Sequence, residues 1–164
     1  MRTALRLLSV AALSVALAAA LGGCTEQQKN AADTAKQKVE QTTTEKQASV
    51  DATLNAVQDK VTQLASAAGD LEARVNGLQL NSDLQEIQRQ LTNAIGEAGD
   101  KKKTAIDEIS NAFNDLISRV DTAAGKLPEG GPVRTKLEEF SAKLKEAQAS
   151  VTEAAASMEA SSTP

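Results

Sequence analysis

The chain has 164 residues and a net charge of −4, from 18 Lys and Arg against 22 Asp and Glu, and it lacks histidine, tryptophan and tyrosine. An acidic chain with almost no aromatic rings disfavours a nucleic-acid-binding surface, which needs clustered cations and stacking platforms. Without histidine, and with no phosphate loop, metal-ligand cluster or nucleophile beside a base, the sequence predicts neither an enzyme nor a cofactor site.

The first 23 residues have the composition of a secretory signal peptide. Arg2 and Arg6 precede an apolar run that ends in Leu21-Gly22-Gly23-Cys24. A basic start, an apolar stretch and small residues at a cleavage site are typical of such a leader. The run is short for a membrane-spanning helix, which needs ~20 apolar residues.

The ending Leu21-Gly22-Gly23-Cys24 resembles the lipobox of bacterial lipoproteins, in which Leu, a small residue and Gly precede a cysteine that is lipidated and becomes the new N-terminus. The resemblance implies that signal peptidase recognises Leu21, Gly22 and Gly23 and that Cys24, the only cysteine, is acylated. It also implies export and attachment by lipid to the outer membrane if the host has one, and otherwise to the outer face of the plasma membrane. It covers only residues 1–24. Loss of Arg2 and Arg6 would lower the net charge to −6.

Residues 24–48 are predicted to be the lipidated N-terminus followed by a polar tether. From Thr25 to Gln47 the only large apolar side chain is Val39, so this stretch cannot bury enough surface to offset its ordering entropy alone. Ala31 to Glu40 is rich in Ala, Lys, Gln and Glu, which favour helix. We expect a short helix there and a tether that holds the folded part clear of the bilayer.

A long amphipathic helix is predicted to begin near residue 49. Its apolar residues alternate steps of four and three, which places them on one narrow stripe. The stripe comprises Val50, Leu54, Val57, Val61, Leu64, Ala68, Leu71, Val75 and Leu78. Its flanking charges only weakly specify a parallel homodimer, so we expect it to pack against later helices of the same chain. Asn76-Gly77 is a turn signal, and Ser82 with Gln85 has the capping-box spacing that starts a new helix.

Two further stripes are separated by a phase slip. The first comprises Leu84, Ile87, Leu91, Ala94, Ile95 and Ala98, and the second comprises Ile106, Ile109, Phe113, Leu116, Ile117, Val120, Ala123 and Leu127. Ala98 and Ile106 are eight residues apart where a heptad needs seven, and Gly96 and Gly99 lie near the slip. A helix there either breaks or carries a bulge. We predict a break between Gly96 and Lys103.

The clearest loop is Lys126-Leu127-Pro128-Glu129-Gly130-Gly131-Pro132, because its prolines and glycines prevent a continuing helix. A last amphipathic helix should then end near Ala160, followed by a fraying tail over residues 161–164. Its stripe comprises Val133, Leu137, Phe140, Leu144, Ala147, Val151, Ala154 and Met158. We therefore predict an all-α domain over residues 49–160, an elongated antiparallel three- to four-helix bundle with coiled-coil-like heptad packing.

Lys101, Lys102 and Lys103 form the only basic run. As a functional patch they would contact an anionic surface, such as lipid headgroups or an acidic wall polymer. As an ordinary structural feature they would be a solvated turn or first helical turn, which is the commoner role of a charge run.

These features lead us to expect a lipid-anchored cell-envelope protein whose bundle serves as a spacer, a scaffold or a protein-interaction module. Its partners would be the membrane, through acylated Cys24, and an envelope protein, with no nucleic acid. The alternative is a carrier that binds a lipid or another apolar small molecule where seam alanines leave room between helices. Those alanines are Ala68, Ala94, Ala98, Ala147 and Ala154. An oligomeric coiled-coil rod is a third arrangement, and the sequence leaves the oligomeric state open.

Overall fold

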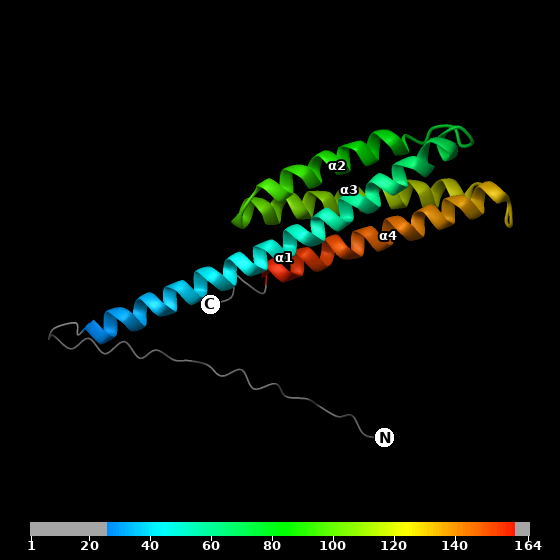
Figure 1. The fold of residues 1–164 in the computed structure, drawn as a ribbon. Coiled ribbons are helices and arrows are strands. Elements are labelled where there is room, and N and C mark those ends of the chain that lie inside the picture. Colours follow the sequence, from blue (N-terminus) through cyan, green and yellow to red (C-terminus); the bar gives the residue numbers. More distant parts are fainter. Residues whose placement is uncertain (1–25, 160–164) are drawn as a thin grey trace, which may run out of the picture. The chain divides into compact units, whose positions relative to one another are not determined.

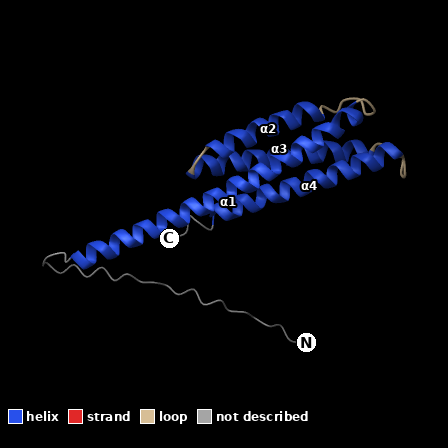
Figure 2. Cartoon of the chain, in the orientation of Figure 1, coloured by secondary structure: helices blue, strands red, loops and turns tan. Residues whose placement is uncertain are grey.

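The computed structural model describes residues 26–159, and it describes side chains from Thr34 onward. Within these residues it contains four α-helices and no strand (Figure 1, Figure 2). The helices are α1 (Glu26–Glu72), α2 (Leu80–Gly96), α3 (Gly99–Gly125) and α4 (Pro132–Glu159). The predicted all-α helical bundle is therefore confirmed.

The chain divides into two compact units, residues 1–36 and residues 37–164. The described part of the first unit is the helical start of α1. The second unit contains the rest of α1 and the other three helices, and we call residues 37–159 the bundle.

The predicted tether is more helical than expected. Helix α1 runs without a break from Glu26 to Glu72, whereas the composition predicts helix only over Ala31–Glu40 before the bundle. In this stretch the hydroxyls of Thr42, Thr43 and Thr44 each donate to the backbone carbonyl four residues earlier. Side chains from Thr34 to Lys46 are exposed, and the first buried residue is Val50.

Helices α1 and α2 run antiparallel, as two reciprocal hydrogen bonds show. The Gln58 amide of α1 donates to Thr92 Oγ1 of α2 (3.0 Å), and the Gln88 amide of α2 donates to Thr62 Oγ1 of α1 (3.0 Å). Residue numbers therefore rise in one helix as they fall in the other. The short connection between the helices, residues 73–79, imposes the same direction.

Helices α3 and α4 are also antiparallel neighbours. Ser141 Oγ donates to Asp121 Oδ1 (2.5 Å), and the Gln148 amide donates to Asn114 Oδ1 (2.5 Å). An ion pair between Lys60 and Glu146 (3.2 Å) joins α1 to α4, which lie side by side in Figure 1. The four helices therefore pack as an up-down-up-down bundle.

The core of the bundle consists largely of the predicted stripes, to which the structure adds Leu80 and Ala124. The buried apolar residues are Val50, Leu54, Val57, Val61, Leu64, Ala68, Leu71, Leu80, Leu84, Ile87, Leu91, Ala94, Ile106, Ile109, Phe113, Leu116, Ile117, Val120, Ala124, Leu137, Phe140, Leu144, Ala147, Val151 and Ala154. They form one continuous cluster, and Val75, Leu78, Leu127 and Met158 pack against it partly buried. Of the seam alanines, Ala98 lies outside the core and is exposed.

The first turn differs from the prediction in how α2 begins. Gly77 adopts a φ of 88°, which suits the predicted Asn-Gly turn. Helix α2 starts at Leu80 rather than at a Ser82 cap, and Gln79 at the N-cap makes no side-chain capping bond. The carboxylate of Glu72 instead accepts hydrogen bonds from the backbone N–H and the side-chain amide of Asn81, both at 2.7 Å. An acidic group from α1 thus satisfies a free donor in the first turn of α2.

The predicted break between Gly96 and Lys103 is confirmed. Glu97 and Ala98 are extended, α2 ends at Gly96, and α3 begins at Gly99 with a φ of 57°. The predicted loop between the last two helices is confirmed as well, because α3 ends at Gly125 and α4 begins at Pro132.

Candidate functional site

The predicted lipidation site lies outside the described residues. Cys24 and the recognition residues Leu21, Gly22 and Gly23 precede Glu26, the first residue of α1. Their assignment stays a prediction from the sequence. The candidate sites that the structure does describe belong to the bundle.

The three consecutive lysines do not form one surface patch. Lys101 is exposed, but the Lys102 side chain is only 1 % exposed and lies in the core. Lys103 is partly exposed and pairs with Glu159 of α4 (2.8 Å). The predicted contact of all three with an anionic surface is therefore wrong for Lys102. The cause is the helical register, since Lys102 stands four residues before Ile106 and continues the buried stripe of α3.

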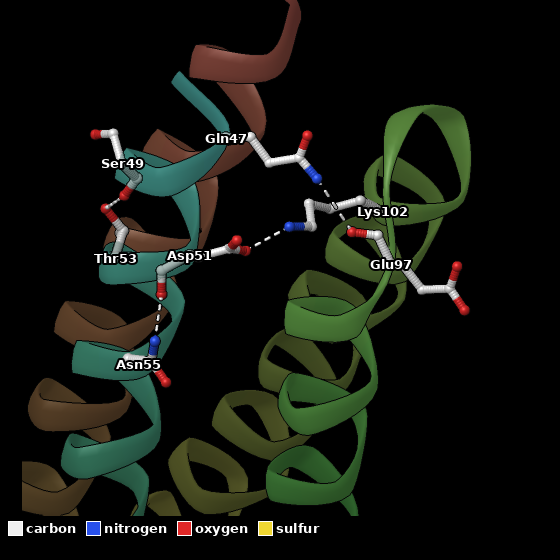
Figure 3. Close-up of polar contacts among 7 residues, drawn as sticks. All are labelled: Gln47, Ser49, Asp51, Thr53, Asn55, Glu97 and Lys102. Carbon is white, nitrogen blue, oxygen red and sulfur yellow. Dashed lines mark hydrogen bonds and ion pairs between the residues drawn. The ribbon is translucent and has the colours of Figure 1, made fainter. Parts of the chain in front are cut away.

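Lys102 forms an ion pair with Asp51 of α1. Figure 3 shows the two side chains pointing toward one another across the gap between the helices. The side chain of Asp51 is 29 % exposed, so the buried ammonium is paired with a carboxylate that still contacts solvent. A buried charge needs such a partner, because its desolvation is costly.

A second polar contact lies beside this ion pair. The Gln47 amide of α1 donates to the backbone carbonyl of Glu97 in the α2–α3 connection (3.5 Å, Figure 3). A small cleft of about 190 Å³ adjoins it, with Lys46, Val50, Gly99 and Met158 among its lining residues. Polar interactions therefore hold α1 to the α2–α3 connection at this end of the bundle. Every contact described for Lys102 and Gln47 is internal, which gives this cluster a structural role.

Among the surface ion pairs that shift pKa values, two join α3 to α4. The hydrogen bond between Lys103 and Glu159 raises the pKa of the lysine and lowers the pKa of the glutamate. The hydrogen bonds from Ser141 and Lys145 lower the pKa of Asp121 below its ordinary value of 3.8. All of these groups keep their usual charge at neutral pH, so neither cluster offers a general acid or base poised for catalysis.

The larger cleft is an open groove of about 380 Å³ between α1 and α4, which we call the α1–α4 groove. Leu64, Leu71 and Phe140, which are almost fully buried, form its floor. Polar and charged side chains, with Ala67 among them, form its walls. The wall residues are Lys60, Gln63, Ala67 and Asp70 on α1, and Lys136, Glu139, Lys143 and Glu146 on α4.

The charges of the α1–α4 groove are mostly unpaired within the bundle. Lys60 pairs with Glu146 at one end. Asp70, Lys136, Glu139 and Lys143 take part in no ion pair among the side chains of residues 34–159. This groove therefore presents free charges of both signs above a narrow apolar floor, a combination suited to contact with another charged helical surface.

This groove cannot be predicted from the sequence alone. The alternating charges of α4 are visible in the sequence, but the sequence does not say which helix borders them. The small side chain of Ala67, opposite them on α1, was also visible and carried no signal by itself. Only the bundle topology, with α4 beside α1, brings the two walls together.

Among the described residues, no helix combines the length and apolarity needed to cross a membrane. The described part of the chain also contains no group of three or more Cys, Asp and Glu placed to hold a metal ion. No known protein family, no curated protein and no solved structure matches this chain.

Proposed function

We propose that the chain is a lipid-anchored cell-envelope protein whose bundle serves as a protein-interaction module held at the membrane surface. The anchor would be an acylated Cys24, on the resemblance of Leu21-Gly22-Gly23-Cys24 to a lipobox. Two or more acyl chains make attachment stable where a single chain is marginal.

The observation that carries this proposal is the distribution of apolar side chains in the bundle. Among the side chains from Thr34 to Glu159, Val39, which is 66 % exposed, is the only large apolar one that is exposed. A helix that inserts into a bilayer interface needs a broad apolar face, and these helices use theirs for the core. The described bundle thus offers no broad apolar face to a bilayer, and in this proposal an acylated Cys24 supplies the attachment.

The seam alanines give little support to the alternative of a lipid carrier. Ala68, Ala94 and Ala147 are fully buried among core side chains. Small residues at such positions bring helices together as readily as they leave space between them. None of these alanines lines the α1–α4 groove, whose floor is Leu64, Leu71 and Phe140.

Fatty-acid labelling in a bacterial host that processes lipoproteins tests the anchor. We expect the full chain to incorporate labelled palmitate and to sediment with membranes. Cys24→Ala should abolish the label and release the protein. Thr25→Ala, a substitution at the next residue, is the matched control and should keep both. Unchanged labelling and membrane sedimentation in the Cys24→Ala variant would overturn the proposal.

The choice between an interaction module and a carrier needs a separate measurement. Native mass spectrometry of residues 24–164 purified from cells should give the mass of one or two chains without a bound small molecule. A copurified lipid of constant mass would instead favour the carrier.

A further inference from the structure

The charges along α4 in the α1–α4 groove alternate in sign. Lys136, Glu139, Lys143 and Glu146 are exposed, and their spacing of three, four and three residues places them on one face of the helix. When this order of lysine, glutamate, lysine and glutamate is reversed, each position has a charge opposite in sign to that of the original order. An antiparallel copy of α4 would therefore bring Lys136 opposite Glu146, and Glu139 opposite Lys143.

The α1 wall of the groove is self-complementary in the same way. Lys60 lies toward one end and Asp70 toward the other. An antiparallel copy of α1 would bring Lys60 opposite Asp70. Both walls therefore accept a copy of themselves, with opposite charges facing one another.

The two walls also share one centre. The centre of the α4 pattern falls at residue 141, and the midpoint between Lys60 and Asp70 falls at residue 65. The ion pair between Lys60 and Glu146 fixes the register of the two antiparallel helices. Both helices rise about 1.5 Å per residue. A residue five positions after Lys60 therefore lies at the same level along the bundle axis as a residue five positions before Glu146. Residues 65 and 141 therefore lie at about the same height along the bundle.

We propose that the α1–α4 groove is the docking face for a second copy of this chain, with a two-fold axis running across the groove at the level of residues 65 and 141. A two-fold interface uses the same patch on both copies, so each complementary contact occurs twice. Lys60 faces Asp70, Lys136 faces Glu146, and Glu139 faces Lys143 of the other copy. The unpaired state of Asp70, Lys136, Glu139 and Lys143 within the bundle leaves them free for these contacts.

Charge reversal at the centre of the groove tests this arrangement. The protein used is residues 24–164 with Cys24→Ser, which keeps every described residue and prevents disulfide formation. At low ionic strength we expect its mass in analytical ultracentrifugation to rise with concentration from that of one chain to that of two. Glu139→Lys or Lys143→Glu alone places like charges opposite one another twice. Each should raise the dimer Kd at least about tenfold.

The same pairing predicts rescue in two ways. The double variant Glu139→Lys/Lys143→Glu restores opposite charges and should dimerise like the parent. An equimolar mixture of the two single variants should form heterodimers, since each supplies the charge that the other lacks. Glu108→Lys and Lys101→Glu make the same charge changes at exposed positions of α3 away from the groove. These matched controls should leave the dimer Kd unchanged.

Three results would overturn the proposal. The first is a mass of one chain at every concentration. The second is a dimer that neither Glu139→Lys nor Lys143→Glu weakens. In that case the two copies would meet on another face, or α1 of one copy would face α4 of the other. The third is weakening by both single variants without rescue in the double variant or the mixture. Circular dichroism of each variant confirms that the helices are intact, so that loss of the dimer is not loss of the fold.

Discussion

The buried ammonium of Lys102 on α3 pairs with the half-buried carboxylate of Asp51 on α1. Lys102 belongs to the buried stripe of α3. The next residues of that stripe, Ile106, Ile109 and Phe113, are all apolar. The pair joins two helices that are not consecutive in the chain. It therefore distinguishes one packing of α1 against α3 from other packings that the alanine- and valine-rich stripes would allow.

Removal of the Asp51 carboxylate should destabilise the bundle more than replacement of the buried Lys102 by an apolar residue. Asp51→Asn leaves the Lys102 ammonium buried without a counter-charge, which we expect to lower the free energy of unfolding by about 2–3 kcal/mol. Lys102→Met fills the same space without a charge and should be neutral or stabilising by about 1 kcal/mol. Urea denaturation followed by circular dichroism measures both values.

The double variant Asp51→Asn/Lys102→Met is the internal control for this pair. Once the lysine is absent, the loss of the Asp51 charge should cost little. If Asp51→Asn is equally destabilising with Met at position 102, the carboxylate does not act through Lys102 and the interpretation is wrong.

The pairing of Lys102 also shows the limit of what the sequence predicts. The stripe spacing correctly placed the helix break and nearly every core residue. It contained the position of Lys102 too, four residues before Ile106, but a run of three lysines resembles a solvated surface. At Lys102 the charge pattern and the helical register point to opposite environments. The sequence also does not identify Asp51 as the partner, because it does not say that α1 and α3 are in contact.

The start of α2 gives a second comparison between sequence pattern and structure. Glu72→Ala removes both hydrogen bonds to Asn81 and should cost about 1 kcal/mol of stability, the usual value of a lost helix cap. If the capping box predicted from the sequence were formed, removal of the Ser82 side chain would cause this loss of stability instead. Ser82 is exposed and lies inside α2 as the structure has it, so Ser82→Ala should change stability by less than about 0.5 kcal/mol. Denaturant midpoints of the two variants decide the question, and a larger effect at Ser82 would favour the sequence pattern.

Gly77 should tolerate alanine poorly despite the open space around it. Its φ of 88° is a conformation that residues with a Cβ rarely adopt, and no atom lies within 4 Å of a Cβ added there. We expect Gly77→Ala to lower stability by about 1–2 kcal/mol through backbone strain alone. Gly125, at the end of α3, also has open space but no positive φ. Gly125→Ala should be neutral or slightly stabilising. Thermal denaturation followed by circular dichroism measures the stability of both variants. Equal effects at the two sites would show that strain at Gly77 is not the cause.

The carboxylate of Asp121 should make the bundle less stable in acid. Its hydrogen bonds to Ser141 and Lys145 hold its pKa below the ordinary value of 3.8. A carboxyl with a lowered pKa in the folded state stabilises that state at pH values above the unfolded pKa. That contribution disappears as the pH falls through the lowered folded value. Asp121→Asn should therefore be less stable than the parent at neutral pH, and the two should converge as the pH falls below the lowered pKa of Asp121. A difference that is constant with pH would show that the charge of Asp121 is not responsible.

The proposed dimer, combined with the proposed anchor, predicts that the protein links two membrane surfaces. In an antiparallel pair, the Gln37 residues of the two copies lie at opposite ends, each 28 residues along α1 from the level of residue 65. At about 1.5 Å per residue, they are separated by roughly 80 Å. Residues 24–164 can be coupled through the Cys24 thiol to vesicles that carry a maleimide lipid, because Cys24 is the only cysteine.

Coated vesicles should then cluster, as measured by light scattering, and high salt should disperse them because exposed charge pairs are screened. Vesicles coated with Glu139→Lys should stay dispersed, and a mixture with Lys143→Glu vesicles should cluster again. Glu108→Lys vesicles control for net charge and should behave like the parent. If the protein dimerises in solution with the predicted charge rescue but coated vesicles never cluster, the two-fold contact stands and its role between two membranes is wrong. Clustering that survives Glu139→Lys would instead arise from a surface other than the α1–α4 groove.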